Sequence, residues 1–305
     1  TACAVKGMVG KASSNHQDTG AVPHVSFAGL PFEFTNPAVF AGPPTFNGNN
    51  AAVARVRRDT NGFRLWVAEA PNHDVWHLVE TIDYVVLEQG TGDGYVVATT
   101  SVTPTWKKID LPSSLGTRPW VFQLVQSSNN GAAPDLETSN TMAGLRGYVM
   151  TRMNLNSNLG SSFNIKIESA EGYNQPTEET VAYLAVDSGC TSAATNDDTN
   201  LVSSCPNKYG KMRMGGVEYD TVVGVIRTTS GTHVNQVFNF GRTFTQAPFV
   251  LANMQTFRGS NPAQLRTKAL STTQFTFNVD EDTRDGERYH IEELVAVLAI
   301  GHFSS

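Results

Sequence analysis

Three segments of the chain carry nearly the same pattern of apolar residues. They span 80–87, 179–186 and 293–300, and each starts with a glutamate. Apolar residues follow at almost every position of the second and third segments, whereas the first also contains Thr81 and Asp83. Successive side chains of a β-strand point to opposite faces of the sheet, so apolar residues on both faces predict a strand that is covered on both sides. We expect one face to pack in the core of its own unit and the other face to meet another unit.

The three segments recur at intervals of roughly 100 residues, which is the size of a small domain. A strand led by phenylalanine precedes each of them. About six short strands per unit, separated by turn residues and without a long amphipathic helical pattern, favour an antiparallel β-sandwich. The predicted fold class is therefore all-β, with three tandem antiparallel β-sandwich units. Their predicted boundaries are 1–90, 91–189 and 217–305, with an insert at 190–216 that a disulfide closes.

Composition and charge restrict the possible partners. The chain has 305 residues, of which 16% are charged, and its net charge is -6. A surface that binds nucleic acid needs a basic patch, whereas no basic run here is longer than two residues, so we exclude nucleic acid as a partner. No apolar stretch approaches the roughly 20 residues of a membrane helix, so we predict a soluble chain without a membrane span.

The start of the chain and its cysteines suggest the compartment. The sequence begins at Thr1, which we interpret as the result of cleavage of a secretory signal. Cys190 and Cys205 flank a polar loop, and a disulfide between them would contribute about 3 kcal/mol in the chain-entropy model. Cys3 is then either free or bonded to a neighbouring chain. The alternative is a cytosolic protein with three reduced thiols, but we favour a secreted, extracellular protein.

A series of short motifs recurs in one order, most clearly at 24–90 and 237–301. It consists of a phenylalanine-rich phrase ending in proline, a turn, a basic strand, an alternating strand led by phenylalanine, a His-x-x-Glu motif and a valine-rich closing strand. In the first unit the phrase contains Phe32, Phe34 and Pro37. This order resembles the H-type lectin domain over most of each unit.

The resemblance implies a six-stranded antiparallel β-sandwich from a family that assembles as trimers and binds sugars such as N-acetylgalactosamine at subunit interfaces. Three units in one chain would then form a covalent pseudo-trimer. The closing strands differ from the family, in which this strand usually carries a tryptophan. This chain has Tyr84, Tyr183 and Val297 at the corresponding positions.

The His-x-x-Glu motif supplies the first candidate site residues. His77 with Glu80 and His290 with Glu293 occupy the same place in the first and third units, whereas the second unit has Pro176 where the histidine would be. One interpretation is a site for a sugar hydroxyl or a metal. The other, which we favour, is a His–Glu hydrogen bond that holds the start of the closing strand, because a buried carboxylate needs a partner. A spacing of three places the two side chains on opposite faces of an ideal strand, which argues against a metal.

Basic and aromatic side chains supply the remaining candidates. Arg55 and Arg57 lie on the basic strand of the first unit, where they would bind acidic glycans or pair with Glu69. Arg266 and Lys268 of the third unit have the same two possibilities, with Glu281 as the internal partner, and we favour pairing in both units. Trp76 lies in a polar loop and is the tryptophan that we expect to be exposed and to stack on a sugar ring. The apolar segments around Trp66 and Trp120 predict core positions.

The acidic run at 280–287 superficially resembles a calcium loop. Its glycine occupies the seventh rather than the sixth position of the EF-hand pattern, so we favour a solvated hairpin tip. The chain lacks the nucleophile-elbow, phosphate-loop and His-Glu-x-x-His motifs, and we predict no enzymatic activity, no cofactor and no metal. A polysaccharide-degrading enzyme is the minor alternative, because paired carboxylates need only be close in space.

Two functions remain in competition. The first is a lectin-like extracellular protein that binds glycans or polysaccharide. The second is a structural subunit of an extracellular filament, sheath or surface assembly, which would self-assemble into oligomers. The family resemblance favours sugar binding, whereas covalent pseudo-symmetry and the unpaired Cys3 favour assembly.

Overall fold

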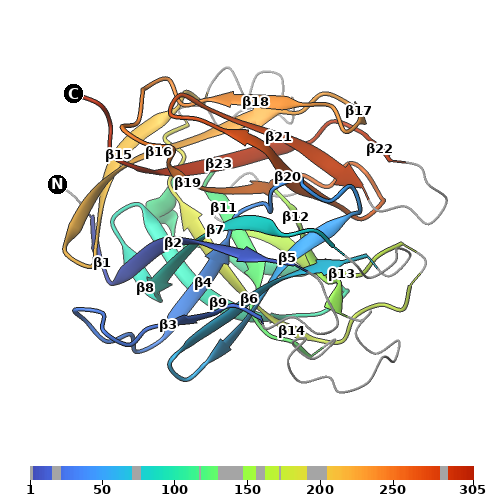
Figure 1. Ribbon diagram of the computed structural model, residues 1–305, viewed down its shortest axis with the longest axis horizontal. Coiled ribbons are helices and arrows are strands. Elements are labelled where there is room, and N and C mark those ends of the chain that lie inside the picture. Colours follow the sequence, from blue (N-terminus) through green and yellow to red (C-terminus); the bar gives the residue numbers. More distant parts are fainter. Residues whose placement is uncertain are drawn as a thin grey trace.

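The computed structural model confirms the all-β antiparallel class (Figure 1). The described parts of the chain are residues 3–15, 22–70, 77–116, 118–129, 147–155, 162–171, 173–190, 205–281 and 288–305. Within them the helical structure is one short 3-10 turn, Ser113–Leu115. Strand-forming segments rich in valine, isoleucine, threonine and aromatic residues account for the rest of the regular structure, as their propensity predicts.

The strands form three pairs of sheets, which we call the first, second and third sheet pairs. In the first pair, β2 (Gly7–Ser14), β7 (Glu80–Glu88) and β4 (Pro37–Ala41) form one sheet, and β3 (His24–Ser26), β6 (Gly62–Glu69) and β5 (Ala52–Asp59) form the other. In the second pair, one sheet consists of β8 (Gly90–Gly92), β9 (Tyr95–Val102), β14 (Glu179–Val186) and β11 (Trp120–Val125). The other sheet consists of β10 (Lys107–Asp110), β13 (Ser162–Glu168) and β12 (Met150–Asn154).

The third pair contains the same two sheets with additions. Its first sheet is β1 (Cys3–Val5), β15 (Lys208–Met214), β16 (Val217–Arg227), β23 (Leu294–Gly301) and β19 (Phe249–Met254). Its second sheet is β18 (Gln236–Asn239), β21 (Gln274–Glu281) and β20 (Ala263–Leu270), and β17 (Gly231–Thr232) pairs with β22 (Tyr289–His290) nearby.

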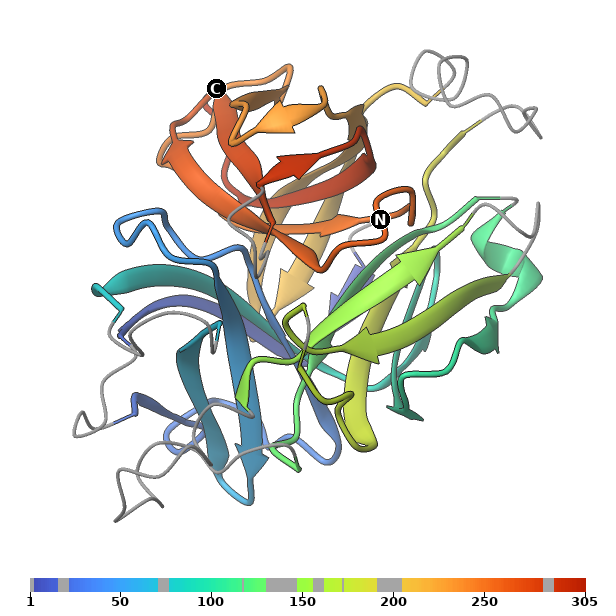
Figure 2. The same ribbon diagram turned by 90° about the vertical axis from the view of Figure 1, so that its right-hand side faces the viewer.

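All three pairs share one strand order. Without the added strands β1, β8, β15, β17 and β22, each pair has six strands in chain order. The closing strand (β7, β14 or β23) lies between the first (β2, β9 or β16) and the third (β4, β11 or β19), and the fifth (β6, β13 or β21) lies between the second (β3, β10 or β18) and the fourth (β5, β12 or β20). The two sheets of each pair enclose their own hydrophobic cluster, around Phe63 in the first, Phe163 in the second and Phe277 in the third. Figure 2 shows the three groups of strands, coloured blue, green and orange to red, around a common centre.

The closing strands β7, β14 and β23 are buried on both faces. Alternate residues such as Tyr84 point into the cluster of their own pair, and the residues between them point into a fourth cluster, which we call the central cluster. Leu87, Leu184 and Leu298 bring the three closing strands together in it, and Trp120 is 1% exposed among them. These strands are therefore apolar on both faces because each face packs in a hydrophobic cluster, as the sequence pattern predicts.

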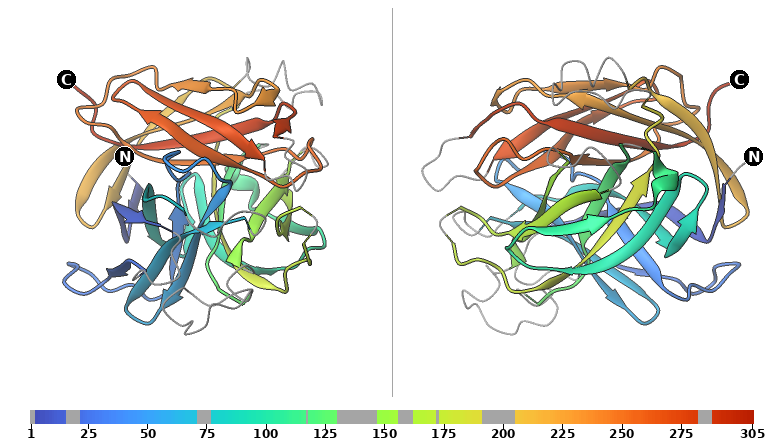
Figure 3. Two further views of the ribbon diagram at one scale, coloured as in Figure 1. Left: turned by 45° about the vertical axis from the view of Figure 1, so that its right-hand side comes forward. Right: turned by 180° about the vertical axis from the view of Figure 1, so that it is seen from behind.

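Two strands depart from the pattern expected from the sequence. The predicted insert 190–216 contributes β15, whose Met212 and Met214 enter the central cluster while its other residues are mostly exposed. The N-terminal β1 pairs in parallel with β15 rather than with the first sheet pair. Both ends of the chain thus take part in one sheet, on the side of the molecule where Figure 3 places the two termini.

The predicted disulfide is present between Cys190 and Cys205. It joins the segment that follows β14 to the residues before β15, and Cys205 packs in the central cluster with 4% of its surface exposed. A covalent link thus holds the second sheet pair to the edge of the third. Among the described residues, no helix has the length and apolar character to cross a membrane.

Candidate functional site

A buried arginine occupies the same position on the fourth strand of each sheet pair. These are Arg55 on β5, Arg152 on β12 and Arg266 on β20, and none is more than 1% exposed. Each guanidinium reaches across to the glutamate that precedes or begins the closing strand of another pair. We name each contact between sheet pairs after the pair that supplies the arginine. The first junction joins the first pair to the second, the second junction joins the second pair to the third, and the third junction joins the third pair to the first.

The three arginine–glutamate distances differ. They are 3.2 Å between Arg55 Nη2 and Glu179 Oε1, 3.8 Å between Arg152 Nη2 and Glu293 Oε1, and 2.8 Å between Arg266 Nη2 and Glu80 Oε1. All three carboxylates are fully buried. Burial of a charge is costly unless it is paired and hydrogen-bonded, so these contacts must form whenever the sheet pairs pack together.

Arg266 makes the most complete set of contacts. Its Nη1 lies 3.3 Å from Asp280 Oδ2 on the neighbouring strand, and its Nε and Nη2 donate to the carbonyl oxygen of Thr45 at 3.1 and 2.7 Å. It also donates to the carbonyl oxygen of Asn50 at 2.9 Å. One side chain of the third sheet pair therefore holds a loop and a carboxylate of the first.

Each junction glutamate accepts hydrogen bonds from the loop after the third strand of its own pair. Hydroxyl groups of Thr45, Ser127 and Thr256 donate to the three carboxylates. Each hydroxyl oxygen also accepts a backbone N–H of the closing strand at 2.7 to 2.9 Å. Backbone N–H groups of the same loops add further donors to each carboxylate. The carboxylate oxygens are thus occupied by protein donors.

The histidine of each His-x-x-Glu motif lies against its glutamate, as predicted. His77 Nε2 is 3.2 Å from Glu80 Oε1, and His290 Nε2 is 3.4 Å from Glu293 Oε1. The histidine and glutamate side chains of each motif can touch because the histidine lies before the closing strand, where the alternation of a strand does not apply. Both rings are buried, 1% and 2% exposed. The structural interpretation of the motif agrees with these contacts.

A glycine makes room for each histidine ring. A Cβ on Gly48 would lie 2.4 Å from His77 Cε1, and a Cβ on Gly259 would lie 2.4 Å from His290 Cε1. The same two glycines donate their N–H groups to Glu80 and Glu293 at 2.8 and 3.2 Å. The close approach of ring to backbone therefore requires the residue without a side chain.

At the second junction, the pKa values of His290 and Glu293 differ from their ordinary values. Burial disfavours charged His290, but the carboxylates of Glu281 and Glu293 outweigh burial and the nearby Arg152, so the pKa of His290 is raised. Burial likewise disfavours the carboxylate of Glu293, but hydrogen bonds from His290, Thr256 and the Arg258 N–H, together with the Arg152 charge, hold its pKa below the ordinary value. The charged pair is the favoured form between these two titrations.

The shifted pKa of His290 predicts a loss of stability as the pH rises. A histidine whose pKa is higher in the folded than in the unfolded state contributes stability that is complete below its ordinary value of 6.5 and is lost above it. We expect the free energy of unfolding to fall as the pH rises above 6.5, and His290→Gln to remove much of this slope. Urea denaturation at a series of pH values measures it.

A matched variant controls for the general effect of losing a histidine. The His24 side chain is 38% exposed, so His24→Gln changes a surface histidine and leaves the second junction intact. An identical slope for the parent and His290→Gln would contradict the assignment to the second junction.

The remaining candidate residues from the sequence are the arginines and Trp76. Arg57 is half-buried on β5, and Trp76 lies outside the described residues. We expected Arg55 to pair with Glu69 and Arg266 to pair with Glu281. The ion pairs described above join Arg55 to Glu179 and Arg266 to Glu80 instead, which corrects this expectation. Arg55 and Arg266 pair within the protein, as expected: Arg55 pairs with Glu179 of the second sheet pair, and Arg266 pairs with Glu80 of the first and with Asp280 of its own. Glu69 accepts a hydrogen bond from Asn50, and Glu281 lies 3.6 Å from His290 Nδ1.

Sequence reasoning missed Arg152 and the hydroxyl residues of the junction loops. A signal existed, because Arg55, Arg152 and Arg266 occupy the same position in the fourth strand of each repeat. The segment around Arg152 reads Thr-Arg-Met and lacks the second basic residue of the other two strands. The strand order shows that Arg152 is equivalent to Arg55 and Arg266.

A groove of about 190 Å³ opens at the third junction, between β2 and β7 of the first sheet pair and β20 of the third. We call it the third-junction groove. Its walls include Lys11, Thr45, Phe46, Lys268 and Ala269. Lys11 and Lys268 are exposed, and the half-buried Phe46 ring lies against the Lys268 ammonium and the Arg266 guanidinium, whose Cζ is 4.9 Å from the ring centroid.

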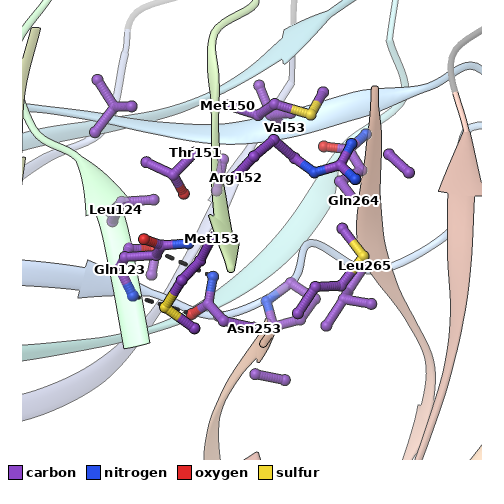
Figure 4. Close-up of a pocket in the computed structure, with 18 of the residues that line it drawn as sticks. Val53, Gln123, Leu124, Met150, Thr151, Arg152, Met153, Asn253, Gln264 and Leu265 are labelled. Carbon is purple, nitrogen blue, oxygen red and sulfur yellow. Dashed lines mark hydrogen bonds between the residues drawn. The ribbon is translucent and has the colours of Figure 1, made fainter. Parts of the chain in front are cut away.

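A second cavity of about 90 Å³ lies where the third and fourth strands of the three sheet pairs meet (Figure 4). Gln123 donates its backbone N–H to Asn253 Oδ1 at 3.2 Å, and Asn253 Nδ2 donates back to the Gln123 carbonyl at 3.3 Å. Gln123 Oε1 and Gln264 Nε2 are buried without a partner among the described residues. Water needs roughly 10–15 Å³ of such space, so the cavity suits ordered water bound to these two amides.

Metal binding finds no support in the part of the chain that the structure describes, where no three histidine, cysteine or carboxylate side chains gather as ligands. Most of the acidic run, 282–287, lies outside the described residues, so its interpretation as a calcium loop or a hairpin tip is untested.

Comparison with known proteins gives no relative for this chain. No protein-family model matches it, and neither a curated protein nor a solved structure matches it. Any functional conclusion therefore rests on the geometry of the chain itself.

Proposed function

We propose that this chain is an extracellular carbohydrate-binding protein without catalytic activity, and that the third-junction groove holds the sugar. The observation that carries the proposal is the lining of this groove. It combines polar side chains, such as Asn47 and Thr81, with the ring of Phe46 and with two lysines. Binding sites for small molecules join apolar and aromatic walls to a few placed polar groups in this way.

The buried junction residues support the choice of the groove over the His-x-x-Glu motifs. His77, Glu80, His290 and Glu293 are at most 2% exposed, and both glutamates accept hydrogen bonds from their own loops. A sugar hydroxyl would have to displace these bonds and enter a closed interface. The walls of the groove, in contrast, include exposed side chains such as Lys11, Asn47 and Lys268.

The repeated strand order supports a further part of the proposal, a covalent pseudo-trimer of β-sandwiches like the trimer that the resemblance to H-type lectin domains implies. A sugar at the third junction would then lie between two units. The Cys190–Cys205 disulfide is compatible with an oxidising, extracellular compartment.

A variant that fills the groove tests the proposal. Ala269 is exposed in the groove wall, so Ala269→Trp is expected to block the groove without removing a buried contact. We expect the parent protein to bind a defined set of sugars on a glycan array and Ala269→Trp to lose at least nine-tenths of that signal. Ser101→Trp, at an exposed position of β9, controls for an added surface tryptophan.

Two outcomes would contradict the proposal. Equal array signals for the parent and Ala269→Trp would place the sugar elsewhere. Absence of any sugar signal, together with light scattering that grows with concentration into long assemblies, would favour the structural subunit of a filament, sheath or surface layer.

A further inference from the structure

Lys268 has an unusual environment for an exposed lysine. Its ammonium lies 3.2 Å from the centroid of the Phe46 ring, in the third-junction groove. No hydrogen bond or ion pair joins this ammonium to any residue that the structure describes. Lys208 and Lys108, which are also exposed, lie 2.7 and 2.8 Å from a carboxylate oxygen of Asp187 and Asp110. The groove thus contains a cation whose hydrogen-bond donors are available.

The groove is an unfavourable place for this cation in the absence of an anion. Partial burial lowers the pKa of Lys268; Asp280 opposes this effect and Arg266 adds to it. The face of an aromatic ring attracts a cation but offers no hydrogen-bond acceptor, so the donors of this exposed ammonium face solvent. An anionic group in the groove would offset both effects, because it neutralises the charge and accepts the donors.

A second ammonium lines the same groove. Lys11 Nζ donates to Asp83 Oδ1, and Asp83 Oδ2 accepts the backbone N–H of Val250 at 2.9 Å. Burial raises the pKa of Asp83, against the effects of Lys11 and this backbone N–H. A lysine ammonium has three donors, so the bond to Asp83 leaves Lys11 able to bind a further acceptor. Lys11, Lys268 and Asp83 together give these groove walls a net positive charge.

The geometry points to a sugar residue that bears a carboxylate or a sulfate as the ligand of the third-junction groove, with its anionic group bound by Lys268 and Lys11. This inference rests on the proposed function and names its ligand class. Lysine acts as a point charge and does not impose the paired geometry of a guanidinium, so the same groove accepts either anion.

The size of the groove limits how much of a glycan it holds. Its volume of about 190 Å³ is below the roughly 300–1,000 Å³ of sites that enclose drug-sized ligands. One sugar residue therefore occupies the groove, and the rest of an oligosaccharide extends into solvent. Recognition would then concentrate on a single charged residue at a chain end or on a branch.

Titration calorimetry with three oligosaccharides of equal length tests the inference. One ends in glucuronic acid, one carries a terminal sulfate and one is neutral. We expect the parent protein to bind at least one acidic ligand tenfold or more tightly than the neutral one, and added salt to weaken this binding. Lys268→Met is expected to reduce the affinity for the acidic ligand at least tenfold and to leave the neutral one within twofold.

Matched variants separate a charge effect from a loss of folding. Lys268→Arg retains the charge and is expected to keep acidic binding within a few-fold of the parent, and Lys108→Met removes an exposed lysine of β10, away from the groove. Lys11→Met is expected to weaken acidic binding in the same direction as Lys268→Met. Preference for the carboxylate or for the sulfate ligand identifies which anion the groove selects.

The outcomes that overturn the inference differ from those that overturn the proposed function. Equal affinity for neutral and acidic sugars, unchanged in Lys268→Met but lost in Ala269→Trp, would overturn the charged ligand class and leave the sugar site in place. Absence of binding to any oligosaccharide would overturn both.

Discussion

Replacement of Arg266 with methionine is expected to lower the free energy of unfolding by about 3–5 kcal/mol. Arg266 is fully buried and lies 2.8 Å from Glu80 and 3.3 Å from Asp280. Methionine fills much of the same space but removes the guanidinium from two buried carboxylates and removes its hydrogen bonds to the carbonyl oxygens of Thr45 and Asn50. Urea denaturation measures the change through the transition midpoint and slope.

A surface ion pair gives the matched control. Lys208 and Asp187 lie 2.7 Å apart with side chains 42% and 31% exposed, so Lys208→Met is expected to change the free energy of unfolding by less than about 1 kcal/mol. A loss of similar size in both variants would mean that the third junction is not held by its buried arginine. Addition of Glu80→Gln to Arg266→Met is expected to recover part of the loss, because one unpaired charge is then removed.

Replacement of Trp120 with alanine is expected to cost about 3–5 kcal/mol, the range found for large aromatic residues in protein cores. Trp120 is 1% exposed and packs in the central cluster, to which the closing strands of all three sheet pairs contribute. The cavity left in this cluster would weaken the packing of every pair on the others. We therefore expect a single unfolding transition, moved to lower urea, by both fluorescence and circular dichroism.

Trp106 provides the comparison for this variant. It is 39% exposed and makes an edge contact with Phe257 at 5.2 Å, so Trp106→Ala is expected to cost no more than about 1.5 kcal/mol. Two separate transitions in Trp120→Ala, with only one of them shifted, would show that the sheet pairs unfold independently and that the central cluster does not couple them.

The sequence was most informative where a pattern has a single physical cause. Apolar residues on both faces of 179–186 and 293–300 required cover on both sides, and both closing strands have it. The polar loop between Cys190 and Cys205 indicated a disulfide, which is present. Trp66 and Trp120 lie in the core, 2% and 1% exposed, as their apolar neighbours predicted.

The sequence was least informative about the partners of charged residues. Glu69, on the neighbouring strand of the same sheet, was the expected partner of Arg55. The actual partner, Glu179, is 124 residues away in the chain. The choice between them depends on how one sheet pair packs on the next, and no local pattern records that packing.

The amino-acid sequence by itself determined the β class, the repeated strand pattern, the disulfide and the contact of each His-x-x-Glu motif, because periodicity, loop polarity and the need of a buried carboxylate for a partner act over short stretches of chain. The tertiary structure decided which arginine meets which glutamate and where β1 and β15 pair. It also placed Lys11 and Lys268, which are far apart in sequence, in one groove. These features arise where one sheet packs against another, so their cause is packing geometry and not local propensity.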